Sequence, residues 1–154
     1  MKELNLPSYS FKFKLGDDGK TLIFDEIRKK FVALTPEEWV RQHFINYLVN
    51  EKEYPKGLVA VEVMFKMNKL SRRADILVYD KKGEPVLIVE CKAPTVKIST
   101  RVFDQIVAYN QKFRLKYIVV TNGMQHYACS TDLEKGQWSF LDSIPGYDSI
   151  IHGK

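Results

Sequence analysis

Two carboxylates and a lysine stand near the ends of two apolar segments that follow one another in the sequence. Asp75 lies in RADILVYD, and Glu90 and Lys92 end VLIVECK. Residues two apart in a strand point to the same face, so Glu90 and Lys92 are predicted to project together and Cys91 to the opposite face. Burying a carboxylate and an ammonium group costs free energy unless they are paired or bind a ligand. These residues are therefore candidates for a functional site.

The turn KKGEP (81–85) joins the two segments, so they are predicted to pair as antiparallel strands about 4.8 Å apart. We expect Asp75 to begin its strand, which would bring it to the sheet edge where Glu90 and Lys92 end theirs. Two carboxylates without neighbouring histidines favour a hard divalent cation, Mg²⁺ or Mn²⁺, over zinc. The backbone carbonyl of Cys91 is a further candidate ligand.

The lysine of this set would orient or deprotonate a water molecule, or neutralise charge on a phosphoryl transition state. Together the three side chains predict metal-dependent hydrolysis of a phosphodiester. A Glu-x-Lys tripeptide alone is common by chance, and a structural ion pair is the alternative. The matching aspartate and the buried character of VLIV favour the functional interpretation.

The elements that must position these residues begin with a β-rich N-terminal region. YSFKFKL (9–15), the turn GDDG (16–19) and TLIF (21–24) predict a β-hairpin, and RKKFVAL (28–34) predicts a third short strand. A helix is predicted over 35–54, with Thr35 as its N-cap.

The remaining elements follow from residue patterns in the same way. Alternation predicts that Glu62 shares a strand face with Met64, opposite Val61 and Val63. A second amphipathic helix is predicted to be capped by Ser99 or Thr100. The predicted strands are 57–67, 73–80, 86–92, 116–121 and 124–130, and the second helix spans 99–114.

This order, α-β-β-β-α-β-β, predicts a three-layer α/β fold with a mixed central sheet flanked by two helices. We expect one globular domain in three parts. These are an N-terminal β-hairpin extension (1–34), a core (35–130), and a C-terminal strand and tail (131–154).

Composition and charge limit the class of protein. The chain is 45% hydrophobic and 28% charged, which indicates a soluble folded domain. No apolar run approaches a membrane span, so we expect a cytoplasmic protein without a membrane partner. Cys91 and Cys129 form no CxxC motif, which disfavours zinc and favours buried, reduced thiols. The net charge of +5 permits a polyanionic partner.

RADILVYD followed by GEPVLIVECKAP resembles the core of the PD-(D/E)XK nucleases, with Asp75, Glu90 and Lys92 at the motif positions. More narrowly, LTPEEWVRQHF, YP, RRADILVYD, LIVECKAP, DQIVAYN and TNG, in this order, resemble the N-terminal nuclease domain of type I restriction enzyme R subunits. The resemblance covers roughly residues 24–130. It implies a restriction-endonuclease-like fold and Mg²⁺-dependent cleavage of DNA.

The resemblance also implies that an acid on the first helix completes the metal site. Glu37 and Glu38 are the candidates, and Glu38 is slightly preferred because it faces Arg41 and Gln42. The alternative is that both acids simply complement the helix dipole.

Contacts to DNA are the third implication. QIVAY matches a Gln-xxx-Tyr motif, so Gln105 and Tyr109 would lie on one helix face and touch the DNA backbone, together with Arg72 and Arg73. Alternatively, Tyr109 belongs to the apolar helix stripe and is an ordinary core residue.

One feature departs from the R subunits. These 154 residues contain no G-x-x-x-x-G-K-[ST] loop, so we expect no translocase motor within them. The expected partners are DNA, separately encoded restriction or helicase subunits, and a second copy in a homodimer. The alternatives are a non-cleaving nucleic-acid-binding or docking module on the same fold, and a nuclease acting on RNA or branched DNA.

Overall fold

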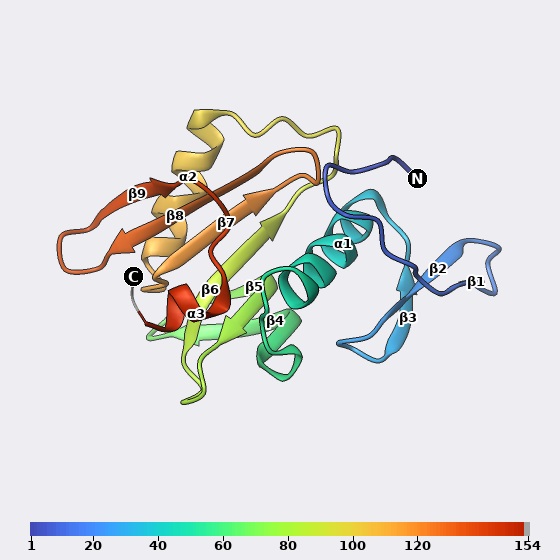
Figure 1. The fold of residues 1–154 in the computed structure, drawn as a ribbon, viewed down its shortest axis with the longest axis horizontal. Helices are drawn as coiled ribbons and strands as arrows, with labels where there is room; N and C mark the ends of the chain where they lie inside the picture. The colour runs from blue at the N-terminus through green and yellow to red at the C-terminus, as the bar shows by residue number, and fades with distance from the viewer. Residues whose placement is uncertain (153–154) are drawn as a thin grey trace.

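The computed structural model describes residues 1–152, which form two β-sheets and three α-helices (Figure 1). The predicted N-terminal hairpin and third strand form a small antiparallel sheet, in which the central strand pairs with both neighbours. Its strands are β1 (Phe13–Leu15), β2 (Thr21–Asp25) and β3 (Lys30–Ala33).

The larger sheet has six strands whose spatial order follows their order in the sequence. The pair β6–β7 is parallel and every other pair is antiparallel, so the sheet is mixed, as predicted. Its strands are β4 (Val59–Met67), β5 (Leu70–Tyr79), β6 (Pro85–Cys91), β7 (Tyr117–Thr121), β8 (His126–Asp132) and β9 (Gln137–Leu141).

Both predicted helices form, and each begins at a side-chain cap. Helix α1 (Pro36–Asn50) follows Thr35, whose Oγ1 accepts a hydrogen bond from the backbone N–H of Glu38 at 3.0 Å. Helix α2 (Thr100–Gln111) follows Ser99, whose Oγ accepts from the N–H of Val102 at 3.2 Å, so Ser99 is the N-cap. Both helices end earlier than predicted. Within residues 1–152, none of the helices is long and apolar enough to cross a membrane.

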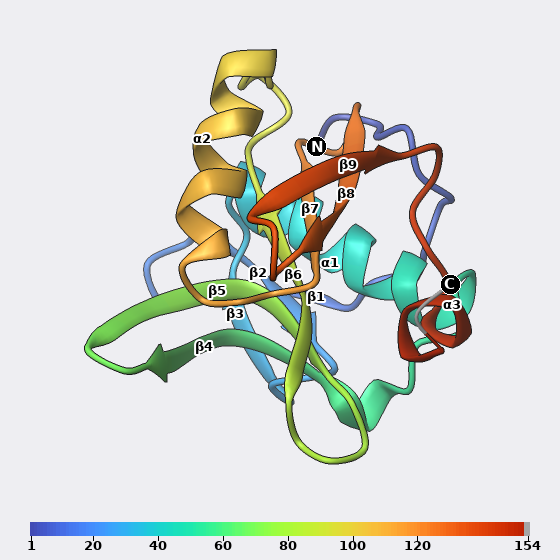
Figure 2. The same ribbon diagram turned by 90° about the vertical axis from the view of Figure 1, so that its left-hand side faces the viewer.

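The two helices pack on opposite faces of the six-stranded sheet (Figures 1 and 2). Phe44 of α1 belongs to one buried core with Val89, and Phe103 of α2 belongs to the other with Ile88. The mixed α/β class is therefore confirmed. Helix α1 also lies between the larger sheet and the small one, as Figure 1 shows.

The C-terminal region contains β9 and a short helix, α3 (Tyr147–Ile151). The predicted C-terminal strand is present, and α3 lies within the segment predicted as a tail. The last two residues of that segment, 153 and 154, lie outside the described part. The division of the chain into three parts stays a prediction.

The prediction that side chains alternate strictly along β4 is wrong at Glu62. This residue has a left-handed backbone conformation, with φ of 52°. Val61 packs in the core under α1, whereas Val63 packs in the core under α2. In the neighbouring strand Asp75 occupies the same level, and it lies in the middle of β5 rather than at its beginning. The sheet faces therefore change over at the level of the candidate site.

Candidate active site where β5 and β6 separate

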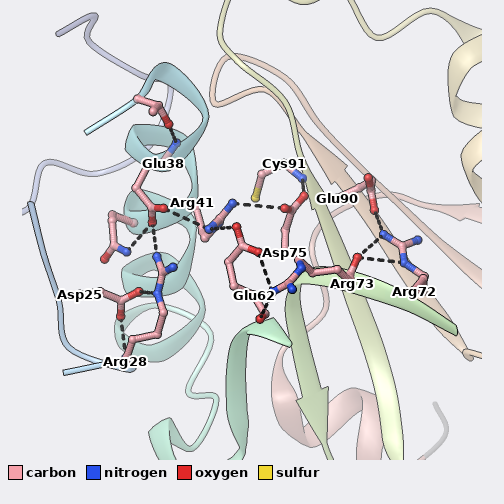
Figure 3. Close-up of polar contacts among 12 residues, drawn as sticks. Asp25, Arg28, Glu38, Arg41, Glu62, Arg72, Arg73, Asp75, Glu90 and Cys91 are labelled. Carbon is pink, nitrogen blue, oxygen red and sulfur yellow. Dashed lines mark hydrogen bonds and ion pairs between the residues drawn. The ribbon is translucent and has the colours of Figure 1, made fainter. Parts of the chain in front are cut away.

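Asp75 and Glu90 are the first residues beyond the paired part of β5 and β6. The ladder between these strands extends to the pair Ile76–Val89. Beyond it, Oδ2 of Asp75 accepts a hydrogen bond from the backbone N–H of Cys91 at 2.8 Å. The carboxylate of Asp75 thus occupies the place of a ladder contact and closes the end of the strand pair (Figure 3).

The other oxygen of Asp75 is turned toward α1. Arg41 donates from Nη2 to Oδ1 of Asp75 at 3.3 Å and from Nη1 to Oε1 of Glu62 at 3.1 Å. Burial and the charges of Glu90 and Glu62 raise the pKa of Asp75, opposed by the N–H of Cys91 and by Arg41. Negative charge is therefore concentrated around this carboxylate.

Glu38, not Glu37, is the helix acid that faces the candidate site. Oε1 of Glu38 accepts from Nη1 of Arg41 at 3.0 Å, and Oε2 accepts from Nη2 of Arg28 and Nε2 of Gln42, both at 2.8 Å. Its side chain is 8% exposed, whereas Glu37 is exposed. Both oxygens of Glu38 are bonded to side chains of the protein.

A chain of alternating charges continues from Glu38 into the small sheet (Figure 3). Arg28 donates from Nε to Oδ2 of Asp25 at 2.5 Å, and the backbone N–H groups of Ile27 and Arg28 donate to Oδ1. Burial opposes ionisation of Asp25, but these bonds outweigh it and hold its pKa below the usual value. Ion pairs therefore connect β2 to α1, and α1 to β4 and β5.

Glu90 is turned toward the opposite face of the sheet. Its Oε1 accepts a hydrogen bond from Nη2 of Arg72 at 2.5 Å. Nη1 of Arg72 donates to Oδ1 of Asn110 in α2 at 2.6 Å, and the guanidinium carbon lies 5.4 Å from the ring centre of Tyr109. The structure therefore brings Asp75 and Glu90 together as neighbours, while different arginines bind the two carboxylates from the α1 and α2 sides.

The other predicted site residues surround this point. Lys92 directly follows β6, where its backbone N–H donates to the carbonyl of Thr121 at 2.8 Å, and its side chain is half-buried. Arg73 is 59% exposed and lies 3.5 Å from Oε2 of Glu62. On α2, Gln105 is exposed and Tyr109 is 43% exposed, so Tyr109 is not an ordinary core residue.

Sequence patterns did not identify Glu62 and Asn110 as parts of this cluster. Each nevertheless interrupts an apolar pattern. Glu62 stands inside VAVEVMF, and Asn110 falls on the buried stripe of α2 with Phe103 and Val107. A polar residue at a buried position requires a partner, so both interruptions were usable signals. Arg41, three residues after Glu38, was noted only as its neighbour on the helix.

The donor atoms suit a hard divalent cation. Asp75, Glu90 and the carbonyl of Cys91 offer oxygen ligands, the type that Mg²⁺ prefers. Burial raises the pKa of the Cys91 thiol well above its usual value, which disfavours a thiolate ligand. Within residues 1–152, no three His, Cys, Asp or Glu side chains are arranged to hold a metal ion, and arginines occupy both carboxylates. The oxygen ligands fit such a cation by their chemistry, with Glu90 released from Arg72 and Asp75 released from Arg41.

Comparison with known proteins identifies the family. The family described as type I restriction enzyme R protein N terminus matches residues 36–145. A solved fragment described as an HsdR subunit of a type I restriction enzyme from Vibrio vulnificus YJ016 aligns over 77% of this chain at 19% identity, with a TM-score of 0.53. This shows a shared fold, and the present chain covers 25% of that one. None of the curated proteins matches. Because the family match spans most of its length, the chain belongs to the family of type I restriction enzyme R protein N-terminal domains.

Proposed function

We propose that this protein is a Mg²⁺- or Mn²⁺-dependent DNA phosphodiester hydrolase, an endonuclease or exonuclease, built on a restriction-endonuclease-like fold. The observation that carries the proposal is that Asp75 and Glu90 are neighbours at the point where β5 and β6 separate. Lys92 lies two residues after Glu90, directly beyond the end of β6. Membership of the R protein family supports the same activity.

Asp75, Glu90 and the backbone carbonyl of Cys91 would hold the cation. When bound, it would supply Lewis-acid stabilisation of the phosphoryl group and activate the attacking water. Lys92 is assigned to orient that water or to neutralise charge on the phosphate. Glu38 is the helix acid of the proposal, and in the arrangement seen it contributes by holding Arg41 against Asp75.

DNA would contact exposed residues of α2 and of the beginning of β5. Gln105 and Tyr109 of α2 and Arg73 of β5 are exposed and are assigned to phosphate oxygens. Arg72 is mostly buried, with 10% of its side chain exposed, and its guanidinium is bonded to Glu90 and Asn110. Its proposed contact with the DNA backbone therefore depends on its release from these partners.

The test is a cleavage assay on supercoiled, linear and single-stranded DNA with Mg²⁺ or Mn²⁺. Wild-type protein is compared with Asp75→Asn and Lys92→Ala, and exposed Lys97→Ala is the matched lysine control. We expect cation-dependent cutting that either site substitution reduces by at least about 100-fold, in the range of one general acid–base or electrostatic contribution. Cutting that survives both substitutions would overturn the assignment.

A non-cleaving nucleic-acid-binding or docking module is the second candidate. The observation that favours it is the pairing of both carboxylates with internal arginines. The two functions are separated by melting the folded protein across a Mg²⁺ titration, because a cation that binds the folded state raises Tm. A docking module would show no rise that depends on Asp75. For either function, the proposed partners are DNA, separately encoded restriction or helicase subunits, and a second copy of the chain.

A further inference from the structure

The guanidinium of Arg72 is held by three different groups. Nη2 donates to Oε1 of Glu90 at 2.5 Å, and Nη1 donates to Oδ1 of Asn110 at 2.6 Å. Nε and Nη2 both donate to the backbone carbonyl of Arg73, at 3.2 and 3.1 Å. With its side chain 10% exposed and that of Glu90 18% exposed, this is a largely desolvated ion pair.

Helix α2 determines where this guanidinium lies. Asn110 is fully buried, and its Nδ2 donates to the carbonyl of Ile106 one turn earlier at 2.9 Å. This bond turns the amide nitrogen toward the helix backbone and leaves Oδ1 directed at Arg72. The ring of Tyr109 lies against the same guanidinium at 5.4 Å. Two adjacent residues of α2 therefore fix Arg72 opposite Glu90.

A divalent cation and this guanidinium cannot share Glu90 at no cost. Arg72 holds Oε1 of Glu90, and two positive groups at one carboxylate repel each other. We infer that Arg72, positioned by Asn110 and Tyr109, is a displaceable internal counter-ion of Glu90 that sets the affinity of the site for a divalent cation. The inference rests on the proposed function, since it concerns the same cation site. Arg72 acts here as a positioning residue through Glu90.

The test measures Mn²⁺ binding directly, from the signal of free Mn²⁺ in electron paramagnetic resonance or by calorimetry, without DNA. Wild-type protein is compared with Arg72→Gln, and with Arg101→Gln as the control. Arg101 is an exposed arginine of α2, so its replacement removes the same charge without touching Glu90. We expect Arg72→Gln to bind Mn²⁺ about tenfold more tightly than wild type, the change expected when one charge-assisted hydrogen bond no longer competes. Arg101→Gln should bind as wild type does.

A purely structural role for Arg72 predicts that Arg72→Gln lowers the affinity for Mn²⁺, because a disordered Glu90 would bind the cation more weakly. Weaker binding by Arg72→Gln, or binding equal to that of Arg101→Gln, overturns the inference. If Arg72→Gln does not fold, Asn110→Ala replaces it, and tighter binding is again expected because Arg72 loses one of its acceptors.

Asp75→Asn separates failure of the inference from failure of the proposed function. If wild-type protein binds no Mn²⁺, or binds it equally well after Asp75→Asn, the proposed cation site is wrong and the inference falls with it. If binding depends on Asp75 but Arg72→Gln is no tighter than Arg101→Gln, only the inference is wrong.

Discussion

At the scale of single residues, the bonds of Glu38 give it a large structural effect. Three side chains donate to its two oxygens, and the residue is 6% exposed. Glu38→Ala would leave Arg28 and Arg41 without a shared carboxylate in a mostly buried setting. We expect it to lower the free energy of unfolding by about 3–5 kcal/mol, the cost of breaking a buried pair. Urea denaturation followed by circular dichroism measures this.

Glu37→Ala is the matched control for Glu38. It removes the same group from the neighbouring position of the same helix turn, but Glu37 is exposed. Its effect should stay within about 0.5 kcal/mol, as for most surface substitutions. Equal effects of the two substitutions would contradict the bonding seen around Glu38.

Two histidines, the buried His43 and the partly buried His126, predict how stability depends on pH. Burial lowers the pKa of His43 and of His126 below the ordinary value of 6.5. In the unfolded chain both would titrate near 6.5, so as pH falls the unfolded state binds protons first. Their contribution to stability is therefore present above about pH 6.5 and lost below it. The urea concentration at the unfolding midpoint should decrease as the pH is lowered from 7.5 to 5.5.

Burial disfavours the charged form of His126, and the bond to Asn5 opposes this effect. The bonds of the ring indicate which nitrogen carries the proton in the neutral form. Its Nε2 lies 2.9 Å from the carbonyl of Asn5, which requires a proton on Nε2. Its Nδ1 lies 2.7 Å from Oγ1 of Thr121, which can donate to it. Adding a proton to Nδ1 would remove that acceptor. Unfolding midpoints that remain constant or rise toward pH 5.5 would show that these histidines do not control acid stability.

At the scale of elements, the turn between β7 and β8 requires a glycine at position 123. Gly123 has φ of 85°, and a Cβ there would lie 2.8 Å from Cδ2 of Leu4 and 3.1 Å from Cγ2 of Val40. Gly123→Ala should therefore destabilise the fold by roughly 1–3 kcal/mol, from the left-handed backbone and the crowding. Denaturant unfolding monitored by fluorescence measures the change.

Gly57→Ala provides the comparison. Gly57 lies in a short 3₁₀ helix, no atom lies within 4 Å of its added Cβ, and its φ is not positive. Stability should change by less than about 0.5 kcal/mol. If Gly123→Ala were equally harmless, the N-terminal segment carrying Leu4 could not pack against this turn as described.

At the scale of the whole molecule, the β4–β5 hairpin is the most prominent projection. Figure 2 shows it extending below α2, away from the other strands. Exposed Lys66 and Lys69 lie near its turn, and exposed Arg73 lies on β5 toward the candidate site. If DNA lies along this hairpin, Lys66→Gln with Lys69→Gln should weaken binding. The slope of log affinity against log salt should then fall by about two, roughly one for each lost phosphate contact.

The matched control removes two lysines that follow the other end of β5. Lys81 and Lys82 are exposed in the turn between β5 and β6, so replacing both with glutamine changes the net charge equally. Fluorescence anisotropy with a labelled duplex, measured across salt concentrations, compares the two double variants. Equal loss of affinity would indicate attraction by overall charge instead of a surface on the hairpin.

Local sequence patterns were sufficient to predict the helix caps, most strands and the candidate site residues. Thr35 and Ser99 cap the two main helices as their side chains predict, because an N-cap depends on residues only a few positions away. Alternating and apolar segments located the strands for the same reason, with boundaries a few residues out. The motif residues Asp75, Glu90 and Lys92 were identifiable as candidates because strand pairing across one turn is also local.

Contacts between distant segments were decided only by the tertiary structure. The contact with Arg28, which lies between β2 and β3 of the small sheet, distinguishes Glu38 from Glu37. The partner of Glu90 is held by Asn110 from α2, far away in sequence. The left-handed conformation of Glu62 interrupts strict alternation in β4. Asp75 and Glu90, which are neighbours across two strands, bind different arginines. Residue patterns record which groups need partners, but packing of the whole chain decides which of several similar charges each one finds.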